Sequence, residues 1–235
     1  MRRLYPALAA GLFILAAPMA AKAQFGLPKL PAGLPGVPTQ PVQQALGRGP
    51  YAQAHSLNEA KVIFLSAYFK ARGETNAAQT LLAIALGLKD EADALKNEAK
   101  ALSSGSLDVD AYAKSQEISD RCDGAIRQKL AEGAVLDADG QAAFSAALPH
   151  FIKGTAALVV LVETTAPTVA ALKGDVSSGS PLNAAANGAS LMFFGKVLVD
   201  LPRLFAAQIE MLKAAIAYGS SHGIKPPADA TALLK

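Results

Sequence analysis

The most regular pattern of apolar positions lies in the C-terminal half of the chain, between Gln141 and Gly219. Two stretches there repeat apolar residues at steps of three and four, which is the spacing of one helix face. The stretch 174–181 joins them, with Gly174 placed to end one helix and Pro181 placed to begin the next. The pattern predicts a hairpin of two long helices. Its apolar positions are Phe144, Leu148, Phe151, Thr155, Val159, Val162, Ala166 and Val169, then Leu191, Phe194, Leu198, Leu201, Phe205, Leu212 and Ile216.

The hairpin is too apolar to stand alone, yet too often interrupted by charge to span a membrane. The run 158–162 is apolar on every side, so other helices should cover it. A span needs about 20 consecutive apolar residues, and Glu163 divides the apolar run of the first arm. We therefore expect no transmembrane span in the mature chain. Pro149, Pro167 and Pro202 fall inside the arms, where we expect kinks or breaks.

Shorter helical patterns precede the hairpin. One helix is predicted from Ser56 to Arg72, stopped by Gly73, with an antiparallel neighbour from 75 to 88. A charged helix over 89–103 could continue this neighbour through a bend at Gly87, and another runs from Asp108 to about 133. The predicted fold is all-α, an antiparallel bundle of five or six helices around the hairpin. The bundle should occupy residues 51–220, followed by a loose tail at 221–235.

The first 23 residues have the features of a signal peptide. Arg2 and Arg3 precede an apolar run, and small residues at 21 and 23 fit cleavage after Ala23. We expect an exported protein, periplasmic or secreted. Residues 24–50 then form a Pro-rich arm, with prolines at 28, 31, 35, 38 and 41, which excludes a helix or an interior strand. Because this arm is also apolar, it is either a spacer lying on the body or an arm that docks on a partner.

Composition and motifs narrow the function by exclusion. Cleavage removes three of the 22 basic residues and none of the 19 acidic ones, which leaves 19 of each sign and no basic surface for nucleic acid. The three histidines, His55, His150 and His222, lack metal-ligand spacing, and Asp137 and Asp139 are better explained by helix capping than by calcium. No motif for a catalytic nucleophile, a phosphate loop or a cofactor is present. We therefore expect a protein that is not an enzyme and holds no metal or cofactor.

Two hypotheses for function remain. The first is an envelope protein that binds an apolar small molecule or lipid between the hairpin arms. The second is a structural or adaptor protein that docks on another envelope component through the Pro-rich arm or a helical face. For the first, the expected ligand pocket or polar core consists of Phe151, Val159, Glu163, Phe194, Leu198 and Phe205.

Two single residues carry alternatives of their own. Glu163 either faces the core, where it needs a partner, or marks the solvent stripe of its helix. Cys122, the only cysteine, is either buried or forms an intermolecular disulfide.

Overall fold

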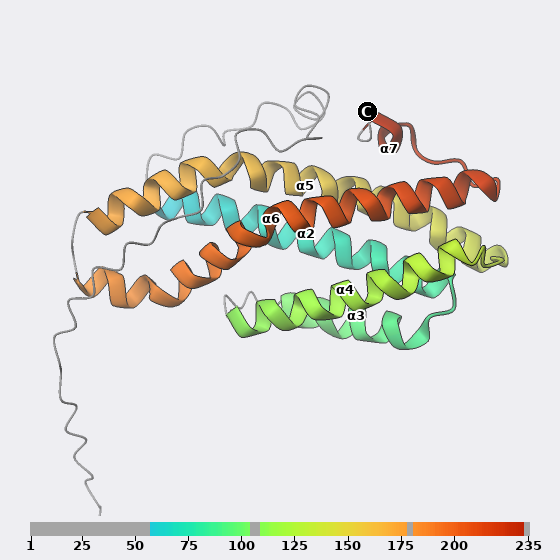
Figure 1. Ribbon diagram of the computed structural model, residues 1–235, viewed down its shortest axis with the longest axis horizontal. Helices are drawn as coiled ribbons and strands as arrows, with labels where there is room; N and C mark the ends of the chain where they lie inside the picture. Colours follow the sequence, from blue (N-terminus) through green and yellow to red (C-terminus); the bar gives the residue numbers. More distant parts are fainter. Residues whose placement is uncertain (1–56, 104–108, 178–180, 233–235) are drawn as a thin grey trace, which may run out of the picture. The chain divides into compact units, whose positions relative to one another are not determined.

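The computed structural model describes residues 57–103, 109–177 and 181–232, which form helices and short connections (Figure 1). The all-α class is confirmed, since no strand occurs within these ranges. The signal peptide and the Pro-rich arm lie outside them. The helices are α2 (Leu57–Ala85), α3 (Lys89–Leu102), α4 (Val109–Ala131), α5 (Ala138–Ser177), α6 (Pro181–Ser221) and α7 (Ala228–Ala232).

Helix α2 is the element around which the others pack. It contacts α3, α4 and α5. The ring centroid of its residue Phe64 also lies 5.0 Å from that of Phe194 in α6. The predicted break at Gly73 is wrong, because α2 runs through this residue without a change of conformation. Buried positions continue across it at helical spacing, and their packing outweighs the roughly 1 kcal/mol that a glycine costs inside a helix. The hairpin is thus not the sole centre of the fold.

The directions of the helices follow from residue pairs that touch. Along α2, Arg72 meets Glu98 and Asn76 meets Leu95, so α3 runs antiparallel to it. Gly154 of α5 lies against Thr75, and Gly140 lies against Ala85, which makes α5 antiparallel as well. Helix α4 runs parallel to α2, because Arg72 contacts Ser119 and the later residue Gln79 contacts Asp123. Helix α6 also runs parallel to α2, because Phe64 contacts Phe194 and the later residue Thr75 contacts Gln208. Figure 1 shows these long helices lying side by side.

The connections explain where α2 ends and where α5 begins. Gly87 has a φ of +70°, a conformation that glycine adopts at little cost, and the Leu88 amide donates to the carbonyl of Ala83 at 2.8 Å. This turn sends α3 back along α2, so the predicted continuation through a bend is wrong. At the start of α5, the Gly140 amide donates to Asp137 Oδ1 at 2.7 Å, which confirms helix capping as the role of Asp137.

The prolines of the hairpin do not break its helices. Helix α5 continues through Pro149 and Pro167, and α6 continues through Pro202. Figure 1 shows the bend expected for α6, whose orange first part lies at an angle to its red second part. Gly174 lies inside α5 rather than at its end, whereas Pro181 is the first residue of α6, as predicted.

The buried side chains explain why these long helices stay together. Phe64, Tyr68, Tyr112, Phe193 and Phe194 join α2, α4 and α6 with ring centroids 5.0–6.1 Å apart, mostly edge to face. Within the described ranges, one helical segment, Ala138–Thr165, is long and apolar enough to cross a membrane, and 56% of its most apolar stretch is buried inside the molecule. A core helix passes the same test, so this segment gives only weak support for a span.

Candidate functional site

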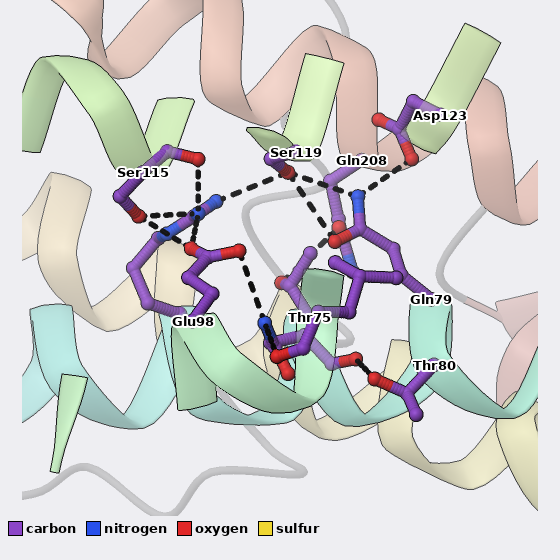
Figure 2. A network of polar contacts seen from close by, with 11 residues as sticks. Thr75, Gln79, Thr80, Glu98, Ser115, Ser119, Asp123 and Gln208 are labelled. Carbon is purple, nitrogen blue, oxygen red and sulfur yellow. Dashed lines mark hydrogen bonds and ion pairs between the residues drawn. The ribbon is translucent and has the colours of Figure 1, made fainter. Parts of the chain in front are cut away.

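A buried polar network fills the space between α2, α3 and α4 (Figure 2). Arg72 Nη2 lies 2.6 Å from Glu98 Oε1 and also donates to the Ser115 hydroxyl at 2.9 Å. Arg72 Nη1 donates to the Ser119 hydroxyl at 3.3 Å. Glu98 accepts further hydrogen bonds from Asn76 Nδ2 at 3.1 Å and from the Ser115 hydroxyl. Arg72 and Glu98 are only 5% and 4% exposed, so this ion pair is shielded from water.

The charges in this network stabilise one another. Burial alone would lower the pKa of Arg72, but the Glu98 carboxylate, together with Tyr68 and Tyr112, raises it, and the pKa lies above its usual value. Burial raises the pKa of the neighbouring Tyr68 to about 12. Tyr112, whose hydroxyl donates to Asp200 at 2.9 Å, also has a raised pKa, first through burial and then through that carboxylate. Both tyrosines therefore remain neutral at ordinary pH.

The network continues along α2 towards α4 and α6. Gln79 Nε2 donates to Asp123 Oδ1 at 2.6 Å and to the Ser119 hydroxyl at 2.9 Å. Burial raises the pKa of Asp123 to about 6, although the hydrogen bond from Gln79 acts in the opposite direction. On another side of α2, the Thr75 hydroxyl donates to Gln208 Oε1 at 3.2 Å. Nearly all of these polar groups are buried, and they form their hydrogen bonds with one another. The network therefore holds the helices in register, and it presents no surface to a ligand.

Among the described residues, a groove lies between α2 and α5. It encloses about 560 Å³, which lies within the usual range of small-molecule sites. Because the two helices are antiparallel, its apolar residues gather at one end and its charged residues at the other. The lining residues are Ile63, Ser66, Ala67, Lys70 and Glu74 from α2, and Lys153, Ala156, Ala157 and Val160 from α5.

The charged end of the groove contains two lysines and one engaged carboxylate. Glu74 Oε2 lies 2.7 Å from His150 Nδ1, so its charge is directed towards α5 outside the lining. Lys70 and Lys153 make no hydrogen bond or ion pair with the described part of the chain. At this end the helices approach closely at Gly154, where an added Cβ would lie 3.0 Å from Thr75 Oγ1. The groove is thus charged at the end where α2 and α5 pack most closely.

The residues that the sequence singled out do not line this groove. Phe151, Val159, Phe194 and Phe205 are buried in the apolar core, and Leu198 packs against that core while partly exposed. Glu163 is exposed, which fits the solvent stripe and removes it from the polar core. The pocket that we expected between the hairpin arms is therefore replaced, as a candidate, by the groove between α2 and α5.

Cys122 is buried in the interface between α3 and α4. Its Sγ lies 3.9 Å from the carbonyl oxygen of Glu91, and burial raises the pKa of the thiol. A buried, neutral thiol is slow to form a disulfide with another chain. The structure therefore fits the interpretation of Cys122 as a core residue.

Sequence reasoning missed the residues that form both features. Arg72, Asn76 and Gln79 were not singled out, and Glu98 lay in a stretch that was interpreted only as a charged helix. Asn76 lies four residues after Arg72, and Gln79 lies three residues after Asn76. This spacing, which places all three on one helix face, was the only signal that they share an environment. The described ranges contain no group of three or more side chains that could hold a metal ion.

Comparison with known proteins adds no further constraint. No protein-family model, curated protein or solved structure matches the chain. Function must therefore be argued from the groove and its residues.

Proposed function

We propose that this chain is an exported, non-enzymatic helical protein that binds an apolar chain, such as the acyl chain of a lipid, in the groove between α2 and α5. The observation that carries the proposal is the groove itself, whose floor of Ala67, Ala156 and Ala157 leads to Ile63 and Val160. Small side chains leave room along the helices, and the apolar end offers a surface that an acyl chain can cover.

The remaining parts of the proposal rest on sequence patterns. Residues 1–23 direct export and are removed after Ala23, because the basic start, the apolar run and the small residues before the cut occur in that order. Residues 24–50 form an extended arm, since five prolines prevent a helix. Helices α2 to α6 act together as an antiparallel bundle that keeps the groove in shape.

An adaptor role is the second candidate, in which the Pro-rich arm or a helical face docks on another envelope component. One observation favours it: Met192 and Val199, seven residues apart on α6, are 67% and 58% exposed. Deleting residues 24–41 tests this role, because capture of a partner should be lost while the helical content is unchanged. Capture that survives the deletion would exclude the arm as the docking element.

Groove binding is tested with a neutral fluorescent dye, N-phenyl-1-naphthylamine, whose emission rises in apolar sites. Ala156→Phe should block the groove, because Ala156 lines it and is only partly buried. Ala146→Phe is the matched control on the same helix, at an exposed position outside the groove. We expect dye binding to be lost in the first variant and retained in the second, with equal helical content by circular dichroism. Equal dye binding in both variants would refute the groove as the site.

Native mass spectrometry of the protein purified gently from an envelope fraction complements the dye. A noncovalent adduct that disappears on denaturation would identify the natural ligand. The same spectrum measures the mass of the mature chain, which should correspond to 212 residues after removal of the first 23.

A further inference from the structure

We infer that the ligand of the α2–α5 groove is a single-chain amphiphile with one carboxylate head, such as a fatty acid. This inference rests on the proposed function and assigns the chemistry of the same site. It predicts that the carboxylate lies between Lys70 and Lys153 and that the acyl chain extends towards Ile63 and Val160.

The order of residues along the two helices supports this orientation. From Glu74 back to Ile63, α2 contributes two charged residues, then Ala67 and Ser66, and finally an apolar side chain. Helix α5, running the other way, contributes a lysine first, then two alanines and a valine. The groove therefore changes from charged to apolar along one axis, which is how an amphiphile changes along its own length.

The length of the groove suits a chain of moderate size. Eleven residues separate Ile63 from Glu74 in α2, which corresponds to roughly 16 Å at the helical rise of 1.5 Å per residue. A straight acyl chain can follow such a path along the two antiparallel helices. A bulky or branched ligand would instead leave the charged end or the apolar end uncovered.

The charges of the groove specify the head group. Lys70 and Lys153 carry two positive charges and Glu74 carries one negative charge, so the lining has a net charge of +1. His150 lies 2.7 Å from Glu74 and draws that carboxylate towards itself. A single carboxylate would make the charges balance and would give each lysine a hydrogen-bond acceptor. A cationic head would meet two like charges, and a neutral head would leave both lysines without a counterion.

Competition with the bound dye separates this inference from the proposed function. Dodecanoic acid and dodecanol share one chain length and differ in head-group charge at pH 8, where the acid is ionised. We expect the acid to displace N-phenyl-1-naphthylamine from the wild-type protein at roughly three- to tenfold lower concentration, the range that two partly exposed ion pairs provide. The advantage should shrink in 0.5 M salt, because salt screens exposed charges.

Paired substitutions locate the effect at the two lysines. The Lys70→Gln/Lys153→Gln variant should bind both compounds with equal affinity, while helical content stays unchanged. The Lys114→Gln/Lys213→Gln variant is the control: it removes the same charge from exposed positions in α4 and α6 that do not line the groove. This control should keep the wild-type preference for the acid.

Each result decides a different statement. Equal affinity of acid and alcohol for the wild-type protein would overturn the carboxylate head and leave the apolar site standing. A preference for the acid that survives in the Lys70→Gln/Lys153→Gln variant would place the head group elsewhere and overturn the inference. Displacement by neither compound would refute the proposed function and this inference together.

Discussion

Removing one member of the buried ion pair should destabilise the protein severely. We consider Glu98→Leu, which replaces a carboxylate by an apolar side chain of similar size. The carboxylate is 4% exposed and accepts hydrogen bonds from Arg72, Asn76 and Ser115. Without it, the Arg72 guanidinium keeps its charge in a site that water does not reach. The substitution therefore removes the only negative charge that contacts Arg72 in the described helices, and it removes one acceptor each from Asn76 and Ser115.

The expected cost follows from these contacts. Breaking a buried ion pair by removing one partner typically costs about 3–5 kcal/mol, because the remaining charge stays buried. A domain of this size has about 5–15 kcal/mol of total stability, so the substitution would remove a large share of it. Arg72→Leu should cost a similar amount, since it leaves the Glu98 carboxylate buried with only two neutral donors.

The double variant distinguishes this explanation from a loss of packing. In Arg72→Leu/Glu98→Leu no charge remains, and Asn76 still donates to the carbonyl of Leu95 at 3.0 Å. We expect the double variant to be more stable than the sum of the two single losses predicts, by at least about 2 kcal/mol.

Urea unfolding followed by far-ultraviolet circular dichroism measures all four proteins, and equal m-values would show that they unfold from comparable states. Strict additivity of the two losses would refute the reasoning. A cost below about 1 kcal/mol for Glu98→Leu alone would refute it as well.

Two further predictions concern a pair of glycines and a partly buried acid, Asp123. Gly73→Ala should stabilise the protein by about 0.5–1 kcal/mol, because no atom beyond the local helix backbone and the two neighbouring residues lies within 4 Å of the added Cβ and alanine favours the helix. Gly154→Ala should destabilise the protein by about 1–3 kcal/mol relative to Gly73→Ala, since its Cβ would lie only 3.0 Å from Thr75 Oγ1. Equal effects of the two substitutions in thermal unfolding would contradict the close approach of α2 and α5. The folded-state pKa of Asp123, about 6, lies above its ordinary value of 3.8, so the folded protein binds this proton more tightly and stability should fall as pH rises from about 4 to 6. Asp123→Asn keeps an acceptor for Gln79 and should remove this loss of stability with rising pH, making the variant about 1–2 kcal/mol more stable than wild type at pH 8. Parallel curves of unfolding free energy against pH for the two proteins would refute the raised pKa of Asp123.

The sequence predicted those parts of the fold that depend on apolar spacing. The stripe from Phe194 to Ile216 and the residues near Phe144 and Phe151 identified α5 and α6, because burial selects apolar residues at every helical turn. Pro181 and Asp137 marked helix starts correctly, since their conformational and capping preferences are local. Such features need no knowledge of the neighbouring helices.

The errors occurred where tertiary contacts decide. Gly73 normally weakens a helix, but packing on both sides of it keeps α2 continuous. The buried positions of Arg72 and Glu98 were not predicted, because charges are seldom buried and only a partner 26 residues away reverses that preference. The groove was invisible for the same reason: its alanines and lysines are ordinary helix residues until α5 lies beside α2.

The polar side of α2 has a consequence for how the chain avoids misassembly. Helix α3 buries a narrow apolar stripe that includes Ala92 and Leu95, and so few apolar side chains can fit a neighbouring helix in more than one position. A slip of one turn, about 5.4 Å, would keep that apolar contact but separate Glu98 from Arg72. The misaligned state would then bury two opposite charges apart, at a cost of several kcal/mol. The ion pair therefore disfavours slipped alignments of α3 on α2 that the apolar stripe alone would allow.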